Sequence, residues 1–215
     1  MFIQQKLEKE LGVKKDIYYT THHLSHAASA FYPSNFSKAA ILTIDGVGEW
    51  QTTTIGYGEG NKITIDEEIN YPNSLGLLYS AFTYFTGFKV NSGEYKMMGL
   101  APYGKPKYSE LILKKLVHLN KDGSIVLNQK YFSYNYSLKM INHKFNKLFN
   151  LKPRKKHQKI TQEYCDIAAS IQDVTNRIIL KMCNYVSHKY KTKNICLAGG
   201  VALNVVAIGY LEEKG

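Results

Sequence analysis

Three consecutive segments rich in β-branched residues place the strongest constraint on the fold of this chain, and they span 38–44, 51–57 and 62–69. Valine, isoleucine and threonine favour extended backbone, and Gly58-Glu59-Gly60-Asn61 is a turn signal between the last two segments. We therefore expect three successive strands, of which the last two form an antiparallel hairpin. The core of the protein is expected to form on this sheet.

Helices are expected around the strands. The clearest one spans 161–190, where apolar residues recur at steps of three and four: Ile167, Ile171, Val174, Ile178, Met182 and Val186. Shorter helices are expected at 4–11, 74–85 and 109–119, and a short strand at 17–20. The polar and aromatic stretch 121–159 is expected to be an irregular surface insertion with one helix near 138–149.

The last part of the sequence carries an α/β pattern. After the long helix, a buried strand is expected at 194–198, a turn at Gly199 and Gly200, and a helix from Val201 onward. This order is typical of α/β folds in which the glycine turn meets a ligand. The stretch 197–204, which ends in Asn204, either cradles a nucleotide at a helix N-terminus or merely connects strand and helix tightly. The fold class is therefore α/β, a mixed sheet with flanking helices.

The composition is that of a globular, cytoplasmic protein. The apolar fraction is 44% and the aromatic fraction 13%, but no apolar run reaches the roughly 18 residues that span a membrane. The first residues are followed by charges rather than by the apolar core of a signal peptide. Cys165, Cys183 and Cys196 are widely spaced, without a CxxC motif, and are expected to be reduced thiols.

The net charge of +11 raises the question of a nucleic-acid partner. Only Arg154 and Arg177 are arginines, so 26 of the 28 basic residues are lysines, which is not typical of a groove-reading surface. The densest basic run, 152–159, is interpreted as a solvated loop between helices, with attraction of an anionic substrate as the next interpretation. We expect neither a specific nucleic-acid partner nor a membrane.

Three histidines within five residues form the first candidate site. His22 and His26 are four positions apart, so on a helix they lie one above the other and could hold one ion. Asp45 follows the buried strand at 38–44, where a carboxylate is costly unless it is paired or bound to a metal. Two imidazoles and a carboxylate suit iron, zinc or manganese. His23 points away from this pair and is expected to contact substrate or to be structural.

Two glycine-containing segments are further candidates. Gly46 and Gly48 make an acidic turn after the strand, which either admits a phosphate or metal close to the backbone or is simply a hairpin turn. In the segment 91–104, Glu94 and Lys96 follow a small-residue loop. They either form a surface ion pair on a capped short helix or present an acid and a base to a ligand.

Five stretches in a fixed order resemble one family, the O-carbamoyltransferases of the NodU/CmcH type. They are HHLSHAASAF (22–31), TIDGVGEW (43–50), SLGLLYSAFTYFTGF (74–88), SGEYKMMGLAPYG (92–104) and LAGGVALN (197–204). The resemblance implies an actin/hexokinase-like (ASKHA, Kae1-like) nucleotide-binding fold. It also implies that His22, His26 and Asp45 bind a ferrous-type ion and that the Gly199-Gly200 loop lies on the adenosine side.

The same resemblance implies a reaction. Family members make carbamoyl-adenylate from carbamoyl phosphate and ATP in a YrdC-like domain, and then pass the carbamoyl group to a substrate hydroxyl at the metal site. The acceptor would be a small molecule, a sugar or natural product. The metal would polarise the carbamoyl carbonyl, and Glu94 or His23 would orient or deprotonate the acceptor hydroxyl.

The sequence departs from the family pattern in three features. The strand and phosphate loop before the first helix, the later aspartate of the metal ligand set and the YrdC-like domain have no counterpart in it. We therefore expect 1–215 to be a partial domain that is inactive or only partly competent alone: a gene fragment, a split subunit that a separate chain completes, or a piece of a longer chain. Two other interpretations stay open: a threonylcarbamoyl-transfer or sugar-kinase relative of the same fold, and a non-catalytic remnant that binds a partner or a nucleotide.

Overall fold

A four-stranded sheet forms the frame of the protein in a computed structural model that describes residues 3–12 and 16–214. Its strand order is β3-β2-β1-β6, with β1 at Lys38–Gly48, β2 at Gln51–Glu59, β3 at Lys62–Asn70 and β6 at Ile195–Ala198. β1 pairs antiparallel with β2 and parallel with β6, and β2 pairs antiparallel with β3. The predicted strands, the hairpin and the mixed α/β class are confirmed.

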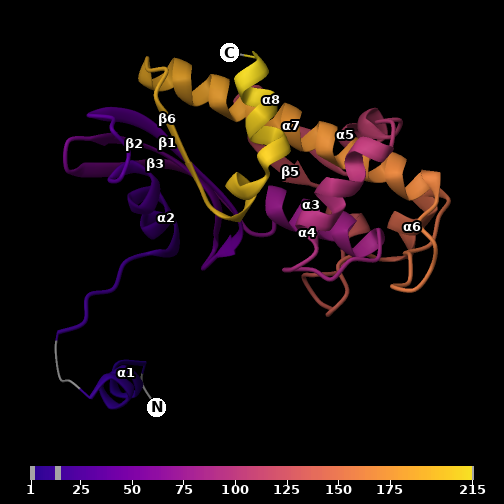
Figure 1. Ribbon diagram of the computed structural model, residues 1–215, viewed down its shortest axis with the longest axis horizontal. Coiled ribbons are helices and arrows are strands. Elements are labelled where there is room, and N and C mark those ends of the chain that lie inside the picture. The colour runs from indigo at the N-terminus through magenta and orange to yellow at the C-terminus, as the bar shows by residue number, and fades with distance from the viewer. Residues whose placement is uncertain (1–2, 13–15, 215) are drawn as a thin grey trace.

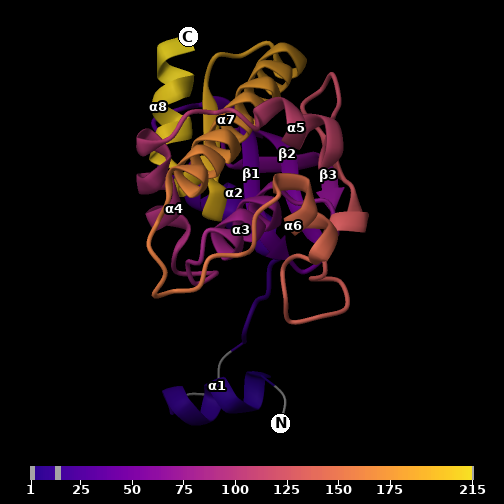
Figure 2. The ribbon, with the colours of Figure 1, turned by 90° about the vertical axis from the view of Figure 1, so that its right-hand side faces the viewer.

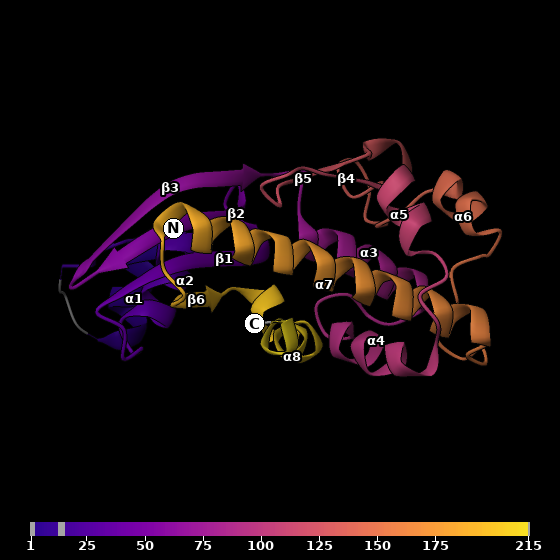
Figure 3. The ribbon, with the colours of Figure 1, turned by 90° about the horizontal axis from the view of Figure 1, so that it is seen from above.

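Strand β1 is covered on both faces, and this fixes where its carboxyl end emerges. Successive side chains of a strand point to opposite faces. Ala40 and Leu42 accordingly face the larger core, whereas Ala39 and Ile41 face a smaller one under α2 (His22–Phe31). Figures 1 and 3 show α2 on one side of the sheet and the long helix α7 (Gln162–Tyr190) on the other. The C-terminal end of β1 therefore lies between the layer of α2 and the layer of α7.

Helix α7 is the main support of the larger core. All six apolar residues of its predicted face are buried. At 29 residues it is about 43 Å long, so it extends from the sheet to the helical end of the molecule. There it contacts α3 (Leu75–Phe85), α4 (Glu94–Leu100) and α5 (Ser109–Lys115). The expected helices at 74–85 and 161–190 are confirmed, and the helix expected at 109–119 ends at Lys115.

The stretch 121–159 is part of the core, which corrects the expectation of a surface insertion. It holds β5 (Ile125–Leu127), which pairs with β4 (Val117–Leu119), then η2 (Gln129–Tyr131) and α6 (His143–Phe149). Two of its phenylalanines pack on α3, as in the edge-to-face contacts of Phe145 with Phe82 and Phe85. Figure 2 shows α6 beside α3. The hydrophobic pattern of the sequence did not predict this packing, because polar turns separate the aromatic residues.

The basic run 152–159 was interpreted as a solvated loop, and the structure corrects this interpretation at Arg154. The run is indeed a loop between α6 and α7, but the Arg154 side chain is only 7% exposed. Its Nε donates to the Thr86 carbonyl at 2.7 Å and its Nη1 to the Gln158 carbonyl at 2.7 Å. The guanidinium therefore holds the loop to the last turn of α3, whose C-terminal carbonyls have no partners within the helix.

The two ends of the described chain differ from the expectation in detail. Helix α1 (Ile3–Leu11) buries no residue and lies away from the rest in Figures 1 and 2. The strand expected at 17–20 is wrong, because these residues are irregular, with Tyr18 and Tyr19 exposed.

After β6 the chain makes a 3-10 turn, η3 (Gly200–Leu203), and α8 begins only at Val205 and runs to Lys214. None of the described helices is long and apolar enough to cross a membrane.

Candidate metal centre

The first two turns of α2 and the end of β1 bring three side chains together. His22 and His26 lie on the same face of α2, one turn apart. The pairing of β1 with β2 shifts register between Ile44 and Gly48, and Asp45 lies in this irregularity. Gly48 lets the strand approach α2 closely, because a Cβ there would be 2.2 Å from Cδ2 of His22.

The three ligand atoms form a nearly equilateral triangle. His22 Nε2 is 2.9 Å and His26 Nε2 3.0 Å from the same carboxylate oxygen, Oδ2 of Asp45. The two Nε2 atoms are themselves 3.0 Å apart. The His22 side chain is 42% exposed and that of Asp45 22%, so the triangle lies at the surface, where an ion and a substrate can reach it.

Protons alone do not satisfy this triangle. If both Nε2 atoms carry hydrogen, both donate to Asp45 and the contact between the two nitrogens is donor against donor. If only one of the two Nε2 atoms carries hydrogen, that hydrogen is the only one available for the three close contacts of the triangle. A cation satisfies all three at once, because each atom then presents a lone pair to the same point. The triad therefore fits a metal better than it fits a hydrogen-bonded cluster.

The edge lengths can be compared with those of a metal coordination sphere. Bonds of about 2.1 Å to nitrogen and oxygen place neighbouring ligand atoms about 3.0 Å apart in an octahedron and about 3.4 Å apart in a tetrahedron. The observed edges of 2.9 to 3.0 Å match one face of an octahedron. Two histidines and one carboxylate on such a face are the donor set of iron(II) sites with open positions. The triad is thus a donor set that iron, zinc or manganese can use.

The other oxygen of Asp45 faces the glycine turn. Asp45 Oδ1 accepts from the Gly46 N–H at 2.7 Å and from the Gly200 N–H at 3.3 Å. Partial burial alone would raise the pKa of Asp45, but hydrogen bonds from His22, from the Gly46 N–H and from His26 lower it below its ordinary value. Asp45 is therefore held in its anionic form, the form that binds a metal.

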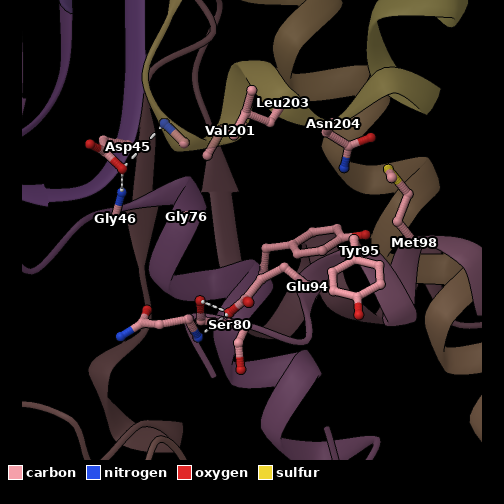
Figure 4. Close-up of a pocket in the computed structure, with 14 residues that line it drawn as sticks. Asp45, Gly46, Gly76, Ser80, Glu94, Tyr95, Met98, Val201, Leu203 and Asn204 are labelled. Atoms are coloured by element: carbon pink, nitrogen blue, oxygen red, sulfur yellow. Dashed lines mark hydrogen bonds between the residues drawn. The ribbon is translucent and has the colours of Figure 1, made fainter. Parts of the chain in front are cut away.

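Beyond Asp45 lies a pocket of about 410 Å³, shown in Figure 4. Asp45 and Gly46 form one end of it, and Tyr95 and Met98 form the other. Gly200 also lines the pocket and bonds to Asp45. Its remaining lining comes from α3, from the start of α4 and the loop before it, and from η3 and the residue after it: Gly76, Tyr79, Ser80, Asn91, Ser92, Glu94, Val201, Leu203 and Asn204. A mostly apolar cavity of this size with a few polar groups is typical of a small-molecule site.

Glu94 lies in this pocket and Lys96 does not. The Glu94 carboxylate accepts from the Ser80 hydroxyl at 2.9 Å and from the backbone N–H groups of Asn91 and Gly93, at 3.0 and 3.1 Å. Lys96 is exposed, and its ammonium lies over the ring of Tyr95, 5.7 Å from the centroid. The structure therefore separates the expected acid and base pair, and only the acid faces a ligand site.

The glycines expected at a cofactor site have two different roles. Gly46 and Gly200 line the pocket, whereas Gly48 and Gly199 allow close backbone contacts. Gly199 has φ +93°, and a Cβ there would be 2.3 Å from the carbonyl oxygen of Ile44. A side chain at position 199 would therefore push the turn away from β1.

His23 is placed as a structural residue rather than at the metal or in the pocket. It is 1% exposed, and its ring nitrogens lie 2.6 Å from the Thr43 hydroxyl and 3.0 Å from the Gln51 carbonyl. Burial lowers the pKa of His23, which matches a neutral ring that accepts from Thr43 and donates to Gln51. Of the two interpretations of His23, the structure favours the structural one.

A buried polar network in the wall of the pocket was missed in the sequence, apart from its member Asn204. The amides of Gln172 and Asn204 bond to each other reciprocally, at 2.9 and 3.1 Å, and the Tyr79 hydroxyl donates to Gln172 at 2.8 Å. Burial raises the pKa of Tyr79, so its hydroxyl stays protonated and donates. The network joins α3, α7 and η3. The only sequence signal was a glutamine on the apolar face of the long helix.

The chain matches the family model described as the carbamoyltransferase N-terminus over residues 3–215. It is 56% identical over 197 residues to the uncharacterized protein sll1178 of Synechocystis, covering 92% of this chain and 32% of that protein. It is 33% identical over 218 residues to the nodulation protein NolNO of Sinorhizobium fredii, covering 100% and 30%. NolO of Bradyrhizobium diazoefficiens is 34% identical over 197 residues, covering 90% and 33%.

The chain therefore belongs to the carbamoyltransferase family. It spans about a third of the length of these curated relatives. Among solved structures, T. kodakarensis HypF is similar with a TM-score of 0.44 at 15% sequence identity, covering 97% of this chain and 34% of that one.

Proposed function

We propose that this chain is the metal-bearing part of an enzyme that moves a carbamoyl group from carbamoyl-adenylate to a hydroxyl of a sugar or natural-product acceptor. The observation that carries the proposal is the position of Asp45. One of its oxygens belongs to the metal triad and the other faces the pocket, so a ligand bound in the pocket has its reacting end beside the metal. Membership of the carbamoyltransferase family gives the type of group transferred.

His22, His26 and Asp45 would hold the metal, which as a Lewis acid would polarise the carbamoyl carbonyl. The pocket would take the adenylate. Its apolar walls at Tyr95 and Met98 suit the faces of a base, while the turn at Gly46 and Gly200, which carries no side chains, leaves room for the phosphate end.

The transfer itself forms one bond and breaks one. The acceptor oxygen attacks the carbamoyl carbon, the bond from that carbon to the phosphate oxygen breaks, and AMP leaves. The acceptor proton has to go to a base. Glu94 lines the pocket and His23 has both ring nitrogens engaged, so the proposal assigns this proton to Glu94.

Transfer from synthetic carbamoyl-adenylate tests the proposal, because it bypasses the step that makes the adenylate. The chain is loaded with Fe²⁺ under anaerobic conditions and mixed with a panel of hydroxyl acceptors, and carbamoylated products are measured by mass spectrometry. We expect product with the natural chain and at least a hundredfold less with Asp45→Asn. The matched control is Asp16→Asn, at an exposed position outside the site, which should not change the yield.

Binding of the adenylate gives a second readout that needs no acceptor. A stable carbamoyl-sulfamoyl adenosine should bind the natural chain in calorimetry, and Tyr95→Ala should weaken it about tenfold by removing an apolar wall. The proposal would be rejected if the natural chain and Tyr95→Ala bound this analogue equally and no acceptor were carbamoylated. It would favour a non-catalytic, partner-binding role.

A further inference from the structure

Nearly the whole net charge of the protein lies in one segment of the chain. The residues 123–162 hold nine of the 28 lysines and arginines and none of the 17 aspartates and glutamates. This segment therefore carries +9 of the net charge of +11, and the rest of the chain is almost balanced. A general preference for lysine would spread the excess over the whole chain, so the charge is a property of this segment.

Most of this segment lies at the end of the molecule that is remote from the metal triad. It begins just before β5 and runs through η2 and α6 to the loop before α7. Figures 1 and 3 show α6 towards one end and α2, which carries His22 and His26, towards the other. The positive charge is therefore gathered where the proposed transfer has no role for it.

All but one of the basic side chains in the segment are exposed. Arg154 is buried, and we call the eight exposed lysines the basic end: Lys130, Lys139, Lys144, Lys147, Lys152, Lys155, Lys156 and Lys159. None of the eight forms an ion pair within the described residues 3–12 and 16–214. Eight ammonium groups without carboxylate partners give this surface a positive potential that attracts polyanions.

The buried Arg154 holds half of the basic end in a fixed loop. Its Nη1 donates to the carbonyls of Lys155 and Lys156, both at 3.3 Å, and to that of Gln158 at 2.7 Å. These carbonyls therefore turn inward, towards the guanidinium. The four lysines of the loop 152–159 are thus exposed on an anchored segment rather than on a free tail.

The side chains of the segment favour a lipid surface over a nucleic acid. Arginine pairs with phosphate in two directions at once, but the one arginine here is buried, and lysines are point charges that suit diffuse attraction to an anionic surface. Tyr136 is 74% exposed and Leu138 is fully exposed, in the loop before α6 that projects from the molecule in Figure 2. An exposed leucine next to a tyrosine and a lysine is typical of a membrane-adsorbed loop.

We propose that the basic end docks on an anionic lipid surface, with Leu138 and Tyr136 among the headgroups and the lysines beside the lipid phosphates. The expectation that there is no membrane partner depended on the lack of a spanning segment, and adsorption needs none. The contact leaves the metal triad accessible, because the triad lies towards the other end of the molecule. It does not depend on the proposed function.

Co-sedimentation with vesicles tests this interaction. The full chain is mixed with vesicles of phosphatidylglycerol and phosphatidylcholine in equal parts, with vesicles of phosphatidylcholine alone, and with a single-stranded RNA homopolymer. We expect at least tenfold tighter binding to the anionic vesicles than to the neutral ones, and release when the salt is raised from about 0.1 M to about 0.5 M. Equal binding to both kinds of vesicle, or binding to the RNA without binding to anionic vesicles, would overturn the proposal.

Two fourfold variants remove the same charge from different places. Lys152→Gln/Lys155→Gln/Lys156→Gln/Lys159→Gln should weaken binding to the anionic vesicles at least tenfold. The matched control changes four exposed lysines outside the segment and should have at most about a twofold effect: Lys9→Gln/Lys62→Gln/Lys89→Gln/Lys193→Gln. Equal losses in the two variants would show attraction by net charge alone and would overturn the proposal.

A substitution at the exposed leucine separates lipid from other polyanions. Leu138→Ser should weaken binding to the anionic vesicles about fivefold and leave any binding to the RNA unchanged, because only lipid takes up the apolar side chain. Val205→Ser, at an apolar side chain that is 66% exposed on α8, is the control and should change neither. Unchanged vesicle binding by Leu138→Ser, or an equal loss in Val205→Ser, would overturn the proposal.

Discussion

Gly48 lies against the imidazole of His22 so closely that a Cβ at position 48 would be 2.2 Å from the ring carbon Cδ2. No ordinary side-chain contact is this short, so any other residue at position 48 has to move either β1 or the ligand ring. The glycine in the turn is thus part of the metal site, although it donates no atom to it.

Gly48→Ala is therefore expected to weaken metal binding by displacing His22, with a loss of about 10- to 100-fold in affinity, as for other groups that position a ligand. Gly46→Ala is a matched control two residues away, because a Cβ there has nothing within 4 Å. Calorimetric titration with Mn²⁺ measures both. Equal affinity of Gly48→Ala and the natural chain would show that the ring has room to move without cost.

The Arg154 side chain should stabilise the fold, although it lies in a basic loop. Its hydrogen bonds go to backbone carbonyls, and removal of the side chain leaves those of Thr86 and Gln158 without this donor. Arg154→Ala should lower the free energy of unfolding by about 2–4 kcal/mol, whereas Arg177→Ala, which breaks surface ion pairs, should cost about 1 kcal/mol or less. Urea denaturation measures both, and similar losses would contradict this role of Arg154.

Asp166 should make the protein sensitive to acid. Its burial alone would raise the pKa, but hydrogen bonds from the Lys107 ammonium, the Gln162 amide and the Lys105 N–H lower it below its ordinary value. A carboxyl with a lowered folded-state pKa stabilises the fold above its unfolded-state pKa, and this stability is lost as pH falls through the folded-state value.

The slope of unfolding free energy against pH below about pH 4 should therefore be shallower in Asp166→Asn than in the natural chain. Glu212→Gln, at an exposed position on α8, provides the control and should keep the natural slope. Denaturant midpoints measured between pH 3 and neutral test this. If Asp166→Asn keeps the natural slope, the hydrogen bonds at Asp166 do not account for the acid sensitivity.

The sequence predicted the elements of this fold better than its packing. The three strands, the strand before the glycine turn and the long helix follow from local patterns, and His22, His26 and Asp45 followed from spacing and a strand end. The core role of 121–159 and the buried Arg154 did not, because both depend on partners far away in the chain, such as Phe82 and Thr86. The roles of Lys96 and His23 likewise depended on side-chain direction, which spacing leaves open.

Anaerobic titration of Fe²⁺ followed by X-ray absorption tests the central claim most directly. The account predicts one ion per chain, two imidazole ligands and the spectrum of a six-coordinate site. It also predicts loss of binding in the His22→Ala/His26→Ala double variant but not in the control His118→Ala/His143→Ala. If the His22→Ala/His26→Ala variant bound iron as the natural chain does, or if the bound ion were coordinated by no histidine, the account would be contradicted.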